Sequence, residues 1–161
     1  MAIVIAGMLD EREEDLRIIK EKIESRGHRT ILIDISIGTG AIVSSLKADV
    51  TCTEIAKLGG GTIEQIKGML AKEREKATSM VAEGLSKKVA QLHQSGELNG
   101  MIAIAGMTGT FLTLTAMRAL PFAVPKLLIS SVTAMPAYAT RLADYFGVRD
   151  ITVMHSVADT V

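Results

Sequence analysis

Short apolar runs alternate along this chain with longer segments of helical periodicity. An unbroken apolar run of four to eight residues is typical of a strand that is buried on both faces, as in a parallel sheet. On this pattern we predict strands at residues 2–6, 30–35, 101–105, 126–130 and 151–154.

The segments between these runs repeat their apolar residues every three or four positions, as Leu16, Ile19 and Ile23 do. Asp10 is placed to cap the first helix, and Gly27 to end it. We predict helices at residues 11–26, 53–58, 62–93 with a break near 67–68, 110–120, and 135–146 with Pro136 in the first turn. Residues 38–50 are expected to form a loop.

This alternation predicts an α/β fold, a three-layer doubly wound parallel sheet of the Rossmann or flavodoxin type. We expect about five strands in the order 2-1-3-4-5. With 161 residues the chain is expected to form a single domain over its whole length. In such sheets ligands bind beyond the carboxyl ends of the strands, where the strand order reverses. The turn after the first strand should therefore lie beside the turn after the third.

The turn after the third strand is the strongest candidate for a binding site. Gly106, Thr108, Gly109 and Thr110 follow an apolar strand and lead into a helix. The free amides and positive dipole at a helix amino end favour an anion such as phosphate, which suggests a nucleotide or a phosphorylated metabolite. The alternative is a tight connection whose glycines serve backbone geometry alone, because the pattern is neither GxGxxG nor a P-loop. Both interpretations remain open.

Further candidates come from the neighbouring strand ends. Asp10 is either a helix cap or a ligand contact, and these roles are compatible. Asp34 either accepts a ribose hydroxyl or is an ordinary loop-edge aspartate, since the dinucleotide fingerprint is absent. The predicted nucleotide-binding residues are Gly7, Asp10, Asp34, Gly106, Thr108, Gly109, Thr110, Ser130, Ser131 and Thr133. No catalytic residue is assigned, because no base pairs with the serines in the sequence.

Composition narrows the choice of partners and compartment. The chain has 18 Lys and Arg against 18 Asp and Glu, so it lacks the basic excess of a nucleic-acid binder. Its single cysteine, Cys52, and three scattered histidines predict no disulfide and no metal site. We see no signal peptide and no apolar run of membrane-spanning length, so we expect a cytoplasmic protein without a membrane partner.

The predicted helix at residues 110–120 is apolar around most of its circumference, whereas a surface helix needs one apolar stripe. Another chain or a second domain is the simplest cover for it. We therefore expect a homo-oligomer or a second-domain partner.

Several segments, in the same order along the sequence, resemble a known family, the ATP-binding domain named after the tomato tobamovirus-resistance protein. They are residues 7–10, with Glu14 following, 34–36, Arg74, 110–121, 124–126, 130–134 and 145–159. The resemblance covers essentially the whole chain. It implies the first, Rossmann-like half of a two-domain oligomeric protein, with ATP or a related nucleotide at the glycine-rich turn.

The chain departs from this family at both turns. Met107 replaces a small hydroxyl residue and Thr108 replaces a glycine, while Met8 stands where the family has threonine. Residues 11–13, Glu-Arg-Glu, stand for Thr-Lys-Gly, and the added carboxylates would repel phosphate. We expect weakened ATP affinity or a different ligand.

Three functions are compatible with these patterns. The first is an oligomeric domain that binds a nucleotide or phosphometabolite and has no chemistry of its own. The second is half of an enzyme that a separate second domain completes. The third is a protein-interaction module whose ligand site has decayed.

Overall fold

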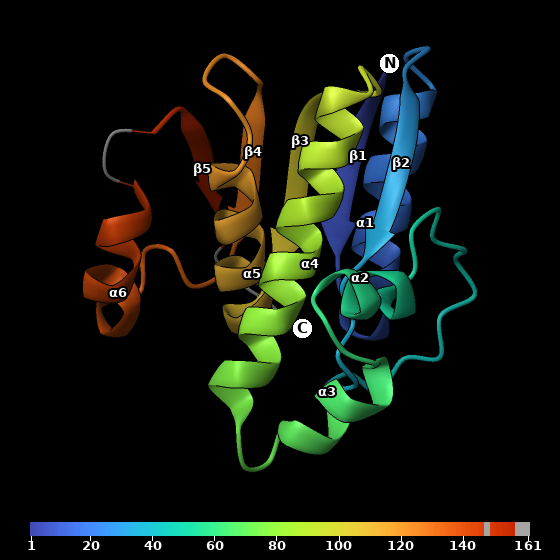
Figure 1. Cartoon of the computed structure of the whole chain (residues 1–161). Coiled ribbons are helices and arrows are strands. Elements are labelled where there is room, and N and C mark those ends of the chain that lie inside the picture. Colours follow the sequence, from blue (N-terminus) through green and yellow to red (C-terminus); the bar gives the residue numbers. More distant parts are fainter. Residues whose placement is uncertain (147–148, 157–161) are drawn as a thin grey trace.

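Parallel strands build one sheet in the order β2-β1-β3-β4-β5 (Figure 1). Every neighbouring pair in the sheet is parallel. The strands are β1 (Ala2–Gly7), β2 (Arg29–Asp34), β3 (Leu98–Ala105), β4 (Lys126–Ser130) and β5 (Ile151–His155). The predicted fold class and strand order are confirmed.

The computed structural model describes residues 1–146 and 149–156. Gly147, Val148 and residues 157–161 lie outside the described part. Of the segment 145–159, which resembles the family, residues 147–148 and 157–159 therefore lie outside it. The helices are α1 (Leu9–Glu24), α2 (Cys52–Leu58), α3 (Ile63–Met69), α4 (Arg74–Gln94), α5 (Met107–Arg118) and α6 (Pro136–Phe146).

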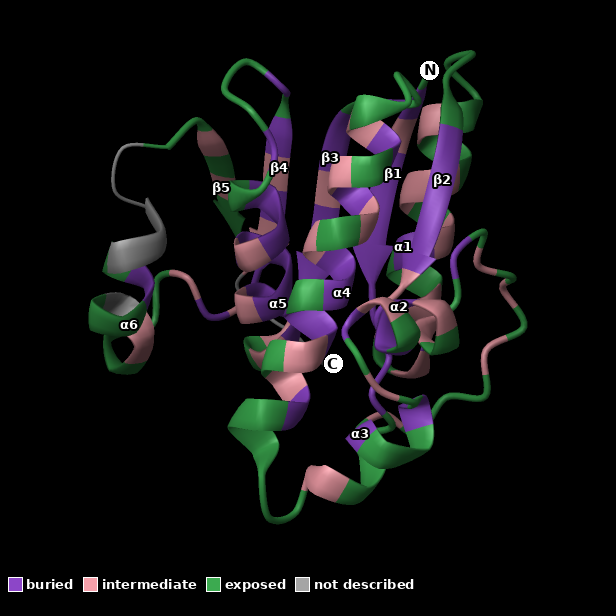
Figure 2. Cartoon of the chain, in the orientation of Figure 1, coloured by how far each residue is buried: buried purple, intermediate pink, exposed green. Residues whose placement is uncertain are grey.

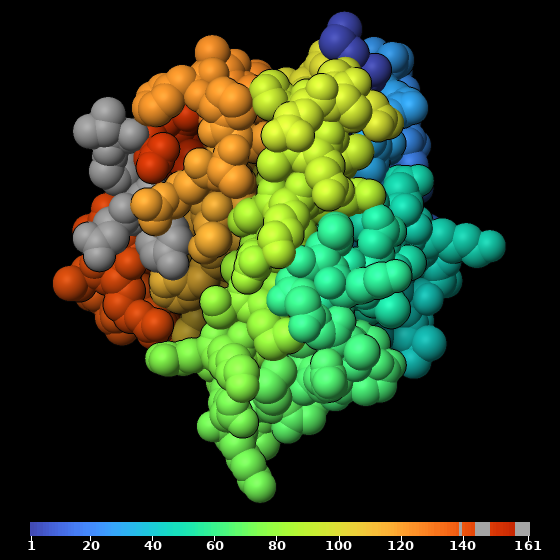
Figure 3. All heavy atoms as spheres, viewed as in Figure 1, coloured from blue at the N-terminus to red at the C-terminus, as the bar shows by residue number. Residues whose placement is uncertain are grey.

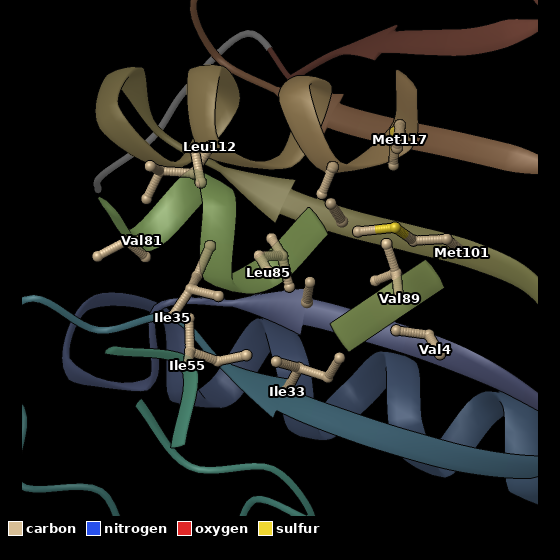
Figure 4. Close-up of a cluster of buried hydrophobic side chains, with 14 of the residues drawn as sticks. Val4, Ile33, Ile35, Ile55, Val81, Leu85, Val89, Met101, Leu112 and Met117 are labelled. Carbon is tan, nitrogen blue, oxygen red and sulfur yellow. The ribbon is translucent and has the colours of Figure 1, made fainter. Parts of the chain in front are cut away.

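The helices cover the two faces of the sheet unequally. Helix α1 lies behind β1 and β2, whereas α2, α4 and α5 lie in front of the sheet, with α6 beside α5 (Figure 1). The larger core is on the front face, where Val81, Leu85 and Val89 of α4 pack toward strand side chains such as Val4 and Met101 (Figure 4). Burial is therefore deepest in the central strands and least in β5 (Figure 2).

The predicted cap of α1 is wrong. The helix begins at Leu9, so Asp10 lies within its first turn, and the Met8 side chain at the N-cap position makes no capping bond. The carboxylate of Asp34 instead accepts the amide of Leu9, and the hydroxyl of Ser36 accepts the amide of Asp10. A local pattern cannot reveal these caps, because they come from the end of another strand.

Helix α5 begins at Met107, earlier than predicted, with Gly106 at the N-cap position. Thr108, Gly109 and Thr110 therefore belong to its first helical turn and not to a preceding loop. The break in the long helical segment falls between Met69 and Arg74, a few residues after the predicted one.

The apolar character of α5 is satisfied largely within the chain. Its buried residues include Leu112, Leu114, Ala116 and Met117, which belong to the front-face core between α4 and the sheet. The apolar helix thus gives no separate reason to expect a partner, and the oligomer remains a prediction. Among the described residues no helix has the length and apolarity needed to cross a membrane.

Candidate functional site

The turn after β1 is filled by the chain's own groups. A side-chain carbon on Gly7 would lie 2.7 Å from the Leu16 side chain, so Gly7 allows α1 to pack closely on β1. The Asp34 Oδ1 atom accepts the amides of Leu9 at 3.3 Å and Ser36 at 2.9 Å. This carboxylate therefore occupies the amino end of α1, where an anion would otherwise find donors.

Asp10 holds the loop that follows β2. Its Oδ2 atom accepts the amides of Gly38 at 3.1 Å and Gly40 at 3.2 Å. The loop lies so close that a side-chain carbon on Gly40 would be 1.9 Å from the Asp10 carbonyl oxygen. Gly7, Asp10 and Asp34 are thus brought together, but the contacts they make here are with the protein itself.

Thr110 and Ser130 join α5 to the end of β4. Both residues are buried, and their hydroxyl oxygens lie 2.6 Å apart. Thr110 also donates to the Gly106 carbonyl at 2.7 Å, and Ser130 accepts the Val132 amide at 3.2 Å. These bonds fix the strand end against the helix and place both hydroxyls away from solvent. Thr133 Oγ1 lies 3.4 Å from the Ser130 carbonyl, which it contacts as a donor, and Ser131 is half-buried in the same segment.

Backbone amides at the amino end of α5 lack protein partners among the described residues. Within the described part of the chain, the amides of Met107, Thr108 and Gly109 have no hydrogen-bond acceptor. Arg74, the first residue of α4, donates from Nη2 to the Thr108 hydroxyl at 3.0 Å. A guanidinium and a helix amino end therefore meet at one point, and both favour negative charge.

A groove with a volume of about 750 Å³ runs from this point between α4 and α5. Besides Arg74 and Thr108, its lining includes Phe111 and Arg141, and the Arg141 guanidinium lies 5.0 Å from the centre of the Phe111 ring. Glu75 and Glu83 also line it, so its charge is mixed. Helix α4 lines one side of this groove and runs along the molecular surface as a green-to-yellow band (Figure 3).

The topology thus places two groups of predicted residues side by side on adjacent strands. The group at the ends of β3 and β4 lies beside the backbone amides of α5 that have no acceptor among the described residues. The group at β1 and β2 makes hydrogen bonds within the protein, through the carboxylates of Asp10 and Asp34. The family resemblance included both Arg74 and Ser36, but sequence reasoning did not identify Arg141 or Phe111 as residues of the site. Nothing in the local pattern marks them, because tertiary packing alone brings them to these positions. Among the described residues no cluster of His, Cys, Asp and Glu is arranged to hold a metal ion.

Comparison with known proteins places this chain in a family. A family model described as the N-terminal domain of an uncharacterised protein family, UPF0261, matches residues 1–161. A UPF0261 protein of Clostridium tetani is 33% identical over 157 residues, which are 98% of this chain and 36% of that protein. A UPF0261 protein of Brucella suis is 30% identical over 131 residues, 81% of this chain and 30% of that protein.

A more distant match is the ToMV resistance protein Tm-1(GCR237) of Solanum lycopersicum, 24% identical over 173 residues, 95% of this chain and 21% of that protein. This match agrees with the family resemblance found in the sequence. The chain spans about a third of the length of the bacterial relatives described above. The match over its whole length shows that the chain belongs to the UPF0261 family, whose N-terminal domain it represents.

Proposed function

We propose that this domain binds a phosphorylated small molecule, of the nucleotide or phosphometabolite class, with a phosphate at the amino end of α5. One observation carries the proposal: the amides of Met107, Thr108 and Gly109 lack acceptors among the described residues, and the Arg74 guanidinium lies beside them. A phosphate there would accept hydrogen bonds from the backbone and a charge-assisted bond from the arginine.

The groove between α4 and α5 supports a ligand larger than phosphate alone. It begins at Thr108 and continues past the apolar face of Phe111, which suits the uncharged part of such a molecule. Arg141, stacked on that ring, adds a second cation near the groove. Glu75 and Glu83 oppose a highly charged ligand, so a molecule with few phosphates fits better than one with a long polyphosphate chain.

The β1 turn is not part of this proposed phosphate site. Its amides already donate to Asp34 and Ser36, and the Asp34 and Asp10 carboxylates would repel a second phosphate. The ligand is therefore expected to extend along the groove and not across the sheet to β1. The domain has no assigned chemistry of its own in this proposal.

Isothermal titration with inorganic phosphate, AMP and ATP tests the proposal. Thr108→Asp places a carboxylate in the first turn of α5, where it stabilises the helix but competes with phosphate. We expect at least a tenfold loss of affinity, which is about 1.4 kcal/mol. The matched control is Thr53→Asp, which makes the same change at the second position of α2 and should leave binding unchanged.

Two results would count against a phosphate at α5. One is the absence of binding by the unaltered domain to all of these probes, which would favour an interaction module. The other is equal affinity of the Thr108→Asp and Thr53→Asp variants. Arg74→Gln gives an independent check, since loss of the cation should weaken binding most at low salt.

A further inference from the structure

The face of the sheet that carries α1 is incompletely covered. In β4, the side chain of Leu128 belongs to the front-face core, so the alternation of the strand directs Leu127 and Ile129 to the opposite face. The same alternation places Thr152 and Met154 of β5 on that face. Leu127 and Ile129 are only half-buried, and Met154 is 57% exposed. We call these four residues the β4–β5 strip.

Helix α1 does not extend over this strip. It packs on β1, β2 and β3, and Figure 1 shows it behind β1 and β2, with no described helix behind β4 and β5. A hollow of about 670 Å³ lies between α1 and the Leu127 end of the strip. Ile3, Ile23, Ile102, Leu127 and Thr152 line it, together with polar residues that include His28 and Asp150. The apolar surface therefore continues from the flank of α1 onto the strands.

A central parallel strand with a half-exposed apolar face is unusual, because parallel sheets are almost always covered on both faces by helices. β4 is such a strand, since it pairs with β3 on one side and with β5 on the other. Contiguous exposed apolar surface of this kind marks an interaction site. The strip lies beside α1, so an occupant must be narrow enough to lie next to that helix, as a second helix of about 10 Å diameter is.

We propose that a helix from the remainder of the family protein, beyond this N-terminal domain, covers the β4–β5 strip and lies beside α1. The length of the relatives supports this occupant, because the matched region is 36% of the Clostridium tetani protein and most of that protein lies outside it. The apolar side chains of Ile23 and Leu127 in the hollow would contact the apolar face of that helix. The proposal does not depend on any bound nucleotide.

Cysteine accessibility tests this docking. A cysteine is placed in the intact Clostridium tetani relative at the position that aligns with Met154, in a background without other cysteines. Its rate of reaction with a maleimide is compared with that of Met154→Cys in the present chain, which also carries Cys52→Ser. We expect the intact relative to react at least about tenfold more slowly, because the covering helix excludes the reagent.

A matched control uses Met135, which is 44% exposed and precedes α6. A cysteine at this position should react at similar rates in the two proteins. Equal rates at the Met154 position would overturn the proposal, as would equal slowing at both positions. Protection of Met154→Cys in the present chain that increases with protein concentration would assign the strip to a second copy and would likewise overturn it.

Discussion

Glu13 connects α1 to the loop that follows β2. Its carboxylate accepts the Ser45 hydroxyl at 2.7 Å and the Ser45 amide at 3.1 Å, and it also pairs with Arg17. The hydrogen bond from the Ser45 hydroxyl is the main cause that lowers the pKa of Glu13 from 4.5 to about 2. The amides of Gly38 and Gly40 in the same loop donate to Asp10, so Glu13 and Asp10 together hold this loop against the first part of α1.

We predict that Glu13→Gln reduces the free energy of unfolding at neutral pH and that this loss disappears in acid. Because the pKa is lower in the folded state, the ionised group stabilises the fold above pH 4.5, and this stabilisation is lost as the pH falls toward 2. Urea unfolding of both proteins across this range measures the difference. Glu14→Gln is the control, since the Glu14 side chain is 77% exposed. A difference between Glu13→Gln and the unaltered protein that stays constant from pH 7 to 2 would contradict the linkage.

At the scale of elements, the apolar runs predict the strands and their order because buried parallel strands have a distinctive composition. The beginnings of α1 and α5 are less predictable. The α1 caps come from Asp34 at the end of β2 and from Ser36 just after it. The first turn of α5 includes Thr108 and Gly109, which have low helix propensity. Topology predicts that the Gly106 and Ser130 regions meet, but only packing brings Arg141 onto Phe111.

The crossing of α2 and α4 depends on a glycine. A side-chain carbon on Gly84 of α4 would lie 2.0 Å from the Ile55 carbonyl oxygen of α2. We predict that Gly84→Ala lowers the free energy of unfolding by about 2 kcal/mol or more, because the two backbones must separate. At Gly68 in α3 an added side-chain carbon would have no atom within 4 Å beyond its own neighbouring backbone, so Gly68→Ala should instead raise this free energy by up to about 1 kcal/mol.

Thermal or urea unfolding of the two glycine variants provides the comparison. Helical propensity favours alanine at both positions, so opposite signs would isolate the effect of the close contact. A loss below about 0.5 kcal/mol for Gly84→Ala would show that α2 and α4 adjust easily, which contradicts tight packing at this crossing.

At the scale of the whole molecule, the sheet is covered unevenly. β1 pairs on both sides and is buried between α1 and the front-face core. Among the described strands β5 pairs with β4 alone, and most of its residues are exposed. Local opening is least costly where few apolar contacts must be broken. The edge that carries β5 and the β4–β5 strip should therefore be the least stable part of the isolated domain.

Native-state hydrogen exchange measures this gradient directly. We predict that the amides of β1 exchange only through global unfolding, while those of β5 open at least about 2 kcal/mol more easily. The difference follows from position, since opening β5 breaks one ladder and exposes little apolar surface, but opening β1 breaks two ladders and exposes both cores. Docking of a helix on the β4–β5 strip would add buried surface mainly to β4 and β5, so β5 should gain protection in the intact relative while β1 changes little. Equal protection of β1 and β5 in the isolated domain would contradict this account, because it would require the exposed edge to unfold together with the buried centre.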